Sequence, residues 1–289
     1  MLEFDYQKPE TLDELIHTLG QDGGCIIAGG TDVIPRMRHN LIQATTVVDI
    51  SRLTELSFIQ QDQNKIRIGA LTTHQALVDS SLVQTTNPAL TSAAASVGCR
   101  QTRHRGTLGG NIGNASPAAD TIPALLVFDA QVYLLGEAGK RQIGLVDFIL
   151  GPGKTQLYAG EIIHSISYAP FDGAWGAAFQ KLGKRNGMAI AVVSAAAAIQ
   201  LDGQGHVREA RLALGSVAPT VVRSPKAEAI LLGQVPTPEV LKRAADAVSA
   251  DISPISDIRS SAAYRQHAAK ILANRALTVA FEQTRGKLS

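Results

Sequence analysis

Apolar residues recur along the chain at helical spacing in several stretches. Leu12, Leu15, Ile16 and Leu19 follow a capping box at Thr11–Glu14 and predict a helix that ends near Gly20. Asn87 followed by Pro88 predicts a helix start, and Gly98 closes that helix. That helix covers residues 89–97, and similar patterns predict further helices at residues 32–39, 72–79, 122–128, 225–232, 238–248 and 261–283.

Other stretches carry the β-branched or alternating pattern that is typical of strands. The run Thr46-Val-Val-Asp-Ile50 is an example of the first kind, and Lys65-Ile-Arg-Ile68 of the second. Strands are predicted at residues 25–28, 46–50, 65–68, 131–135, 142–145, 161–168, 176–182, 189–201 and 207–214. Because helices and strands are mixed along the chain, the pattern indicates an α+β fold. Asp172-Gly173 forms a predicted turn, and we expect the domain boundary there, between regions 1–172 and 173–289.

Composition and charge narrow the class of protein. The 289 residues are 45% hydrophobic and 4% aromatic, which fits a folded protein whose core is built from aliphatic side chains. A formal charge of +2 without a long basic cluster argues against nucleic-acid binding. The longest apolar run, 189–199, is too short to span a bilayer. The first residues lack the basic and apolar regions of a signal peptide, so we expect a cytoplasmic protein.

The cysteines and histidines do not form a metal-binding pattern. The only two cysteines, Cys25 and Cys99, are too few to ligate an iron–sulfur cluster, which normally takes four ligands. The seven histidines are scattered and show no zinc-site spacing. We therefore expect no metal in this chain.

Two glycine-rich stretches are the main candidates for chemistry. In Arg105–Asp120, glycines let the backbone approach a ligand, and exposed N–H groups of such a turn suit a pyrophosphate. In the other stretch, Gly29-Gly30 directly follows a predicted strand. A plain turn is the alternative interpretation of either stretch alone. Neither matches G-x-G-x-x-G, and Gly151–Thr155 lacks the first glycine of a P-loop, since residue 148 is Phe148.

These residues resemble a known family. The chain is similar to the FAD-binding medium subunits of the molybdenum hydroxylases, which include xanthine, aldehyde, nicotinate and aerobic carbon monoxide dehydrogenases. The resemblance covers nearly the whole chain. The matching motifs are Ala28–Asp32, Thr107–Asn111, Ser116–Asp120, Leu157–Ile162, Phe179–Lys181, Tyr264–Arg265 and Arg275–Leu277.

The resemblance implies a fold and a cofactor site. The fold would be a FAD-binding domain of the vanillyl-alcohol-oxidase type at 1–172, with lobes at about 1–55 and 56–172. A C-terminal α/β domain like that of the carbon monoxide dehydrogenase flavoprotein would follow at 173–289. No side chain would act as a catalytic acid or base. The implied FAD-binding residues are Ile27, Ala28, Gly29, Gly30, Thr31, Asp32, Val33, Gly98, Thr107, Gly109, Gly110, Asn111, Ser116, Asp120, Leu157, Lys181 and Ile190.

The resemblance also implies partners. A molybdopterin-containing large subunit would oxidise the substrate, and [2Fe–2S] clusters of a small subunit would relay electrons to this flavin. The flavin would pass them to NAD or another acceptor, in a dimer of heterotrimers. Two departures stand out: Ala189 replaces an aspartate common in the family, and Ile190 replaces the tyrosine typical of the carbon monoxide branch. The second departure favours xanthine, N-heterocycle or aldehyde oxidation.

Several alternatives stay open at this stage. The chain could be the medium subunit of a carbon monoxide dehydrogenase, a self-sufficient FAD-dependent oxidoreductase, or a non-catalytic assembly protein that binds a nucleotide. By itself Lys181 is a typical solvated lysine. Arg36 and Arg38 suit the end of a helix, and Asp129 suits a cap. The remaining histidines of interest have no partner carboxylate at a telling spacing and are interpreted as structural or surface residues; they are His74, His104 and His164.

Overall fold

The computed structural model describes residues 3–22 and 24–285. The N-terminal part is a small sheet in the order β1-β3-β2, with all strands parallel. Parallel neighbours need crossover connections, and helices supply them here. On one face, Leu15 and Leu19 pack with Val48. The elements are β1 Asp5–Gln7, α1 Leu12–Asp22, β2 Cys25–Ile27, α2 Val33–Arg38, β3 Thr46–Asp49 and the 3-10 helix η1 Thr54–Leu56.

The middle part is a five-stranded antiparallel sheet in the order β4-β5-β10-β6-β7. A run of short helices is inserted between its second and third strands in sequence. The elements are β4 Ile59–Asp62, β5 Lys65–Gly69, α3 His74–Asp79, α4 Ser81–Thr86, α5 Pro88–Ala95, α6 Arg100–Arg103, α7 Leu108–Gly113, α8 Thr121–Leu126, β6 Gln131–Gly136, β7 Gly139–Gly144, α9 Leu145–Phe148, the hairpin β8 Ile149–Gly151 and β9 Lys154–Thr155, and β10 Ile162–Tyr168.

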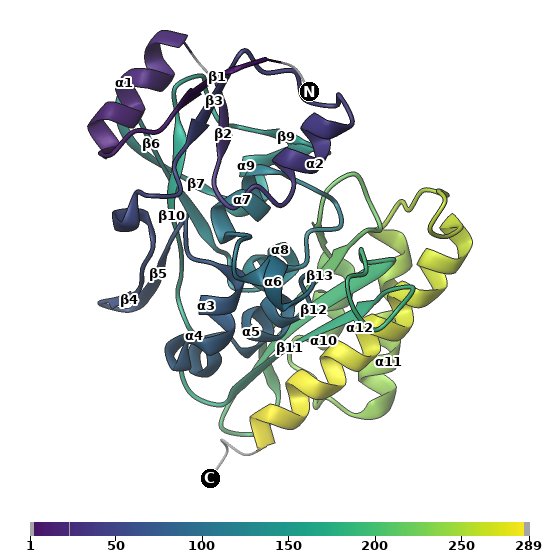
Figure 1. The fold of residues 1–289 in the computed structure, drawn as a ribbon. Helices are drawn as coiled ribbons and strands as arrows, with labels where there is room; N and C mark the ends of the chain where they lie inside the picture. The colour runs from purple at the N-terminus through teal and green to yellow at the C-terminus, as the bar shows by residue number, and fades with distance from the viewer. Residues whose placement is uncertain (1–2, 23, 286–289) are drawn as a thin grey trace.

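The C-terminal part is a four-stranded antiparallel sheet in the order β11-β12-β13-β14. Three helices cover one face of it, and Figure 1 shows the longest, α12, running across β11–β13. The elements are β11 Trp175–Leu182, β12 Val193–Leu201, β13 Val207–Gly215, β14 Val222–Arg223, α10 Pro225–Leu231, α11 Pro238–Ala247, the 3-10 helix η2 Val248–Ala250, and α12 Ala262–Arg285.

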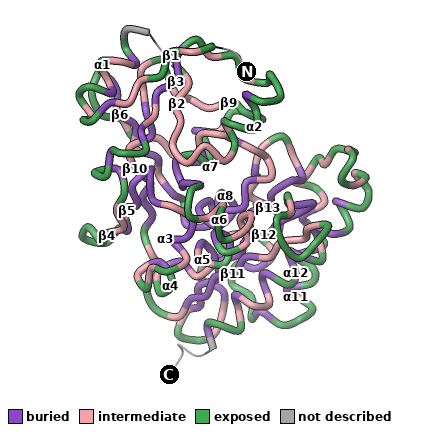
Figure 2. Tube along the Cα trace, in the orientation of Figure 1, coloured by how far each residue is buried: buried purple, intermediate pink, exposed green. Residues whose placement is uncertain are grey.

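The alanine-rich run predicted as a strand is the central strand β12, which is buried on both faces. Successive side chains of a strand point to opposite faces. Ala196 and Ala198 accordingly pack into the core around α5 and α8, whereas Ala195 and Ala197 pack into the core beneath α10–α12. Small side chains on both faces let two helical layers approach the same sheet. Figure 2 shows the resulting band of buried residues through β10–β13 and around α8.

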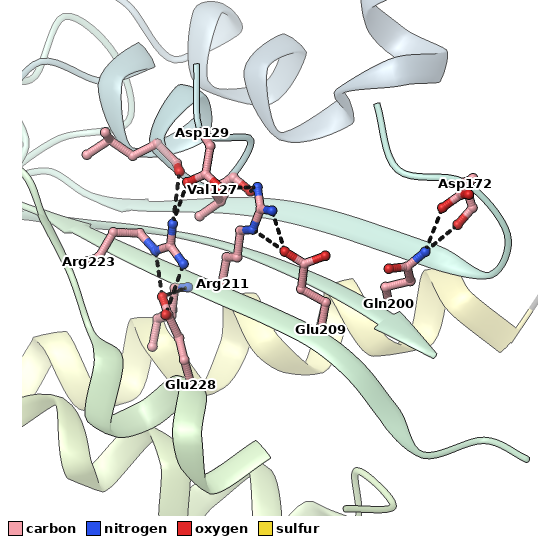
Figure 3. Close-up of polar contacts among 10 residues, drawn as sticks. Val127, Asp129, Asp172, Gln200, Glu209, Arg211, Arg223 and Glu228 are labelled. Carbon is pink, nitrogen blue, oxygen red and sulfur yellow. Dashed lines mark hydrogen bonds and ion pairs between the residues drawn. The ribbon is translucent and has the colours of Figure 1, made fainter. Parts of the chain in front are cut away.

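Charged side chains join the end of α8 to the C-terminal sheet (Figure 3). Asp129 lies 2.8 Å from both Arg211 and Arg223, and Arg223 also pairs with Glu228 at 2.6 Å. At the other end of the sheet, Gln200 donates to the Asp172 carbonyl oxygen at 2.7 Å. Asp129 is therefore an ion-pair residue between the two regions, and the interpretation as a cap is wrong. Its backbone has φ of 47°, in the left-handed region that aspartate adopts more readily than most residues.

The predicted α+β class is confirmed, and most predicted elements occur with ends shifted by one to four residues. The strand predicted at 189–201 begins only at Val193, because residues 189–192 belong to a loop. Thr73 caps α3 because its hydroxyl accepts a hydrogen bond from Ala76 N–H, so the helix predicted at 72–79 begins at His74. The short elements α4, α6, β4, β8 and β9 have too little apolar periodicity to be predicted. No helix in residues 3–22 or 24–285 has the length and apolar character needed to cross a membrane.

Candidate functional site

A cavity of about 890 Å³ lies where the three sheets meet. Its size is within the range of ligand pockets in proteins. The first glycine stretch (residues 28–33), the second glycine stretch (residues 105–120) and loops of the C-terminal region all contribute to its lining. Of the predicted cofactor-binding residues, all but Ile27 and Lys181 contribute to this lining. Ile27 instead lines a second cavity, of about 470 Å³, on the other side of Gly29-Gly30.

The lining combines apolar and polar groups. Apolar side chains come from Ile26, Leu71, Leu157 and Ile162 and from the loop around Ile190. The glycine stretches and polar side chains from α2 and α7 also line the cavity. FAD has a polar diphosphate and two flat ring systems. The cavity therefore fits a dinucleotide of this kind in size and in the mixture of polar and apolar groups.

The first glycine stretch provides free backbone donors. Within the described chain, the N–H groups of residues 29–33 have no hydrogen-bond acceptor. Gly30 has φ of 71°, a conformation that glycine adopts without strain. A Cβ on Gly29 would come within 1.8 Å of the Arg105 carbonyl oxygen, so this glycine lets the two glycine stretches touch. Consecutive free amides beside a cavity suit an anion such as a diphosphate.

The second glycine stretch differs from the prediction of an open turn with exposed N–H groups. Residues 108–113 form the short helix α7, and Thr107 caps it by accepting a hydrogen bond from Gly110 N–H at 3.1 Å. Leu108 and Gly109 donate to the carbonyl oxygens of Thr72 and Ala70, both at 2.9 Å. Asn111 N–H donates to the Thr107 carbonyl oxygen at 3.0 Å. These four amides are therefore used inside the protein and are not the exposed donors that the glycine-rich sequence predicts.

Side chains, rather than amides, present polar groups from this part of the cavity. The Asn111 amide oxygen accepts from the Thr121 hydroxyl at 2.6 Å, and the Asn111 NH2 group has no partner among described residues. The Ser116 hydroxyl oxygen accepts from Ala118 N–H at 3.2 Å, which leaves its hydrogen available. Both residues line the cavity, as the sequence predicted for cofactor-binding residues.

Asp120 and Lys181 form a buried ion pair beside the cavity. Lys181 Nζ lies 2.6 Å from Asp120 Oδ2 and donates to the Ser96 carbonyl oxygen at 3.0 Å. Lys181 is therefore not the solvated lysine that its sequence context alone suggests. The other carboxylate oxygen, Asp120 Oδ1, is buried and has no hydrogen-bond partner in the described chain. A buried acceptor without a partner is costly, and a ribose or ribityl hydroxyl of the cofactor would satisfy it.

Asp120 does not cap α8 through its side chain, so the alternative of a purely capping role has no contact to support it. Burial raises the pKa of its carboxyl group to about 6, and the Lys181 ammonium opposes that shift without cancelling it. The folded protein therefore binds the proton of Asp120 more tightly than the unfolded chain does.

This pKa predicts a pH dependence of stability. Because the folded-state pKa is raised, Asp120 contributes stability as pH falls from above 6 towards 4, and this contribution is lost as pH rises through 6. As the pH falls over that window, the free energy of unfolding of the apo protein should rise by on the order of 2 kcal/mol relative to that of Asp120→Asn. Urea unfolding of both proteins between pH 4 and 7.5 measures the difference. A difference that stays constant with pH would contradict the prediction.

A polar bridge links the two glycine stretches and was not expected. Arg36 donates to the Asn114 amide oxygen at 3.0 Å, and the Asn114 NH2 group reaches Asp32 at 3.4 Å. All three residues line the cavity. The interpretation of Arg36 as a helix-end charge missed this role, because only the fold brings α2 beside the end of α7.

His74 is buried in the cavity wall at 3% exposure and is not a surface residue. Burial lowers its pKa to about 4, so the imidazole is neutral near pH 7.

Leu157, another lining residue, lies in a loop that Glu161 closes. Glu161 accepts a hydrogen bond from Tyr158 N–H at 2.8 Å and pairs with Arg141 at 2.7 Å. Among the described residues that line the cavity, no hydroxyl or thiol donates to a histidine or a carboxylate.

The sequence predicted only one residue from the C-terminal side of the cavity, Ile190. The structure adds three loops there, at 188–192, 216–219 and 255–260. The lining residues 188–191 are all apolar, whereas the charged ones, Asp257, Arg259 and Arg265, come from a separate segment, so no single local pattern marks the site in the sequence. The lining residues are Met188, Ala189, Ala191, Ser216, Ala218, Pro219, Ile255, Asp257, Arg259 and Arg265.

Comparison with known proteins agrees with this geometry. Residues 2–168 match the family described as FAD binding domain in molybdopterin dehydrogenase, and residues 177–280 match the CO dehydrogenase flavoprotein C-terminal domain. The carbon monoxide dehydrogenase medium chain of Hydrogenophaga pseudoflava is 33% identical over 96% of this chain and 97% of that protein. The xanthine dehydrogenase FAD-binding subunit of Escherichia coli O157:H7 is 32% identical over the full length of both.

Solved structures show the same similarity. A carbon monoxide dehydrogenase from Hydrogenophaga pseudoflava, which lacks the Mo-pyranopterin moiety of the molybdenum cofactor, has a chain that superimposes with a TM-score of 0.94 at 33% identity. That match covers 98% of each chain. Quinoline 2-oxidoreductase from Pseudomonas putida 86 gives a TM-score of 0.91 at 29% identity, over 100% of this chain and 99% of that one.

Proposed function

The chain belongs to the family of FAD-binding medium subunits of the molybdenum hydroxylases, and we propose that its role within such an enzyme is electron transfer. It takes electrons from [2Fe–2S] clusters of a partner subunit and delivers them to NAD or another acceptor. The observation that carries this proposal is the dinucleotide-sized cavity with free amides at residues 29–33 and a buried, unpartnered oxygen on Asp120.

Bound FAD would supply the redox centre, and the protein would bind and orient it. Residues 29–33 would donate backbone hydrogen bonds to the diphosphate. Asp120, held by Lys181, would accept a hydrogen bond from a cofactor hydroxyl. Asn111 and Ser116 would add side-chain donors, and Leu157 and Ile190, which both line the cavity, would contact the ring systems.

We place this subunit in a cytoplasmic dimer of heterotrimers that oxidises a xanthine-like or other N-heterocyclic substrate or an aldehyde. Ile190 supports this choice over carbon monoxide, because the resemblance gives that branch a tyrosine there. Overall identity does not rank the substrates: the carbon monoxide, xanthine and glyceraldehyde dehydrogenase subunits are 33%, 32% and 32% identical to this chain. A carbon monoxide dehydrogenase medium subunit is thus the second candidate.

Purification of the chain alone and with its two partner subunits tests the proposal. The lone chain should take up FAD, contain neither iron nor molybdenum, and oxidise no purine, N-heterocycle, aldehyde or carbon monoxide. Oxidation of one of these substrates should appear only in the complex. Metal analysis, flavin absorbance and turnover with an artificial acceptor are the measurements. Substrate turnover by the lone chain would overturn the proposal and favour a self-sufficient flavin oxidoreductase.

A further inference from the structure

Arg265, near the start of α12, is a buried arginine that contacts three separate loops. Only 3% of its surface is exposed. Its Nη1 donates to the Val192 carbonyl oxygen at 2.6 Å and to the Ser216 carbonyl oxygen at 3.1 Å, and its Nη2 donates to Asp257 at 2.7 Å. Each acceptor lies on a different loop: β11–β12, β13–β14, and the segment before α12. One guanidinium thus connects all three loops.

The same three loops form the C-terminal side of the cavity. They contribute Met188, Ile190 and Ile255, whose exposures are 58%, 54% and 68%. Side chains that exposed gain little from a hydrophobic core, so their positions depend on how the backbone of each loop is held. Arg265 is the only residue of the described structure that hydrogen-bonds to all three loops. The loops are also joined in pairs, since Lys184 Nζ donates to the Ile258 carbonyl oxygen at 3.0 Å and Ser253 N–H donates to the Val217 carbonyl oxygen at 2.9 Å.

Two of the residues that Arg265 contacts, Asp257 and Ser216, make further hydrogen bonds within and between the loops. The Asp257 carboxylate also accepts from the N–H groups of Arg259 and Ser260, at 2.9 and 3.1 Å, and so closes the third loop on itself. Hydrogen bonding to Arg265 is the largest cause that lowers the pKa of Asp257, to about 2, so the carboxylate is ionised at neutral pH. The Ser216 hydroxyl donates to the Ala191 carbonyl oxygen at 3.0 Å and joins the first two loops.

The backbone conformation of Ser216 indicates that contacts with surrounding residues fix this loop. Its φ of 63° is unfavourable for a residue with a side chain. Such a conformation persists where surrounding contacts fix it. Here Ser216 N–H donates to the Pro117 carbonyl oxygen at 2.8 Å, its hydroxyl reaches Ala191, and its carbonyl oxygen accepts from Arg265. Pro117 belongs to the second glycine stretch, so the contact also ties the C-terminal wall to the rest of the cavity.

We propose that Arg265 is the positioning residue of the cavity wall that the C-terminal region supplies, and that it sets how Met188, Ile190 and Ile255 meet the bound cofactor. This rests on the proposed function as a FAD-binding subunit. A lysine cannot replace Arg265, because a single ammonium group does not offer the planar fork that reaches two carbonyl oxygens and a carboxylate together.

The test compares FAD-loaded full-length chains carrying Arg265→Lys, Asp257→Asn or Arg275→Lys with the wild type, each purified with its co-purifying subunits. Arg275 is an exposed arginine on the same helix and serves as the matched control. Release of FAD, followed by the rise in flavin fluorescence, should be at least tenfold faster in Arg265→Lys. The visible circular dichroism of the bound flavin should change as well. Asp257→Asn should show the same changes to a smaller extent, and Arg275→Lys neither.

The outcomes separate this inference from the proposed function. If Arg265→Lys and Asp257→Asn unfold more easily but release FAD at the wild-type rate with unchanged circular dichroism, Arg265 is merely structural and the inference is overturned. If Arg265→Lys does not fold, Asp257→Asn decides by the same two readouts. A wild-type chain that binds no FAD would instead overturn the proposed function, and this inference with it.

Discussion

Gly110→Val is expected to give a folded protein that holds roughly a tenth or less of the wild-type FAD. Gly110 is exposed on the cavity side of α7, and a Cβ there would meet only the Thr107 hydroxyl, at 2.9 Å. Valine would fill space that the cofactor needs and would disturb the capping hydroxyl, at a cost of roughly 1–3 kcal/mol in binding. Flavin absorbance per chain after reconstitution measures the loss.

The neighbouring glycine provides the matched control, because its Cβ would point into the protein. A Cβ on Gly109 would lie 2.7 Å from Ala70 Cβ and 2.8 Å from the Ala70 carbonyl oxygen. Gly109→Ala should therefore lower the free energy of unfolding of the apo chain by roughly 1–3 kcal/mol, as overpacking does. Gly110→Val should lower that free energy by less, on the order of 1 kcal/mol, because the Thr107 capping hydroxyl must shift but valine is no worse than glycine in a helix. Full flavin content in Gly110→Val would show that Gly110 does not face the cofactor.

The two glycine motifs show how much of the site could be predicted from the sequence alone. The paired glycine motifs located the site, because glycine in such number is seldom explained by packing. Their separate roles could not be predicted, since these depend on hydrogen bonds made by distant residues. The amides of Leu108 and Gly109 are used by Thr72 and Ala70, whereas those of residues 29–33 are free. The same Gly-Gly pattern occurs in both stretches. The sequence alone therefore could not predict which stretch leaves its amides free for an anion and which uses them in the fold.

The C-terminal wall of the cavity could not be predicted from the sequence, for a different reason. Ser216 lies 49 residues from Arg265 along the chain and Asp257 eight, and neither spacing forms a local pattern that indicates a shared contact. The same holds for Asp129, whose arginine partners come from β13 and β14. The α+β class and most element positions were predictable, because hydrophobic periodicity is a local signal. Long-range polar contacts have no such signal in a single sequence.

Asp120→Ala is expected to weaken FAD binding at least about tenfold and to destabilise the apo chain. A charge-assisted hydrogen bond from a cofactor hydroxyl to the free Oδ1 is worth roughly 1.5–3 kcal/mol, and alanine removes it. The same change leaves the buried Lys181 ammonium with only the Ser96 carbonyl oxygen. Breaking a buried pair in this way costs roughly 3–5 kcal/mol of stability. FAD titration and urea unfolding measure the two effects separately.

A second substitution separates binding from stability. In Asp120→Ala combined with Lys181→Met, no unpaired charge is left in the interior, and a buried ion pair replaced by apolar groups is often neutral for stability. We therefore expect the double variant to recover most of the lost unfolding free energy. Its FAD affinity should stay low, because no group replaces the free carboxylate oxygen. If FAD binding returned together with stability, Asp120 would serve only to hold Lys181, and the cofactor hydroxyl would have to be bound elsewhere in the cavity.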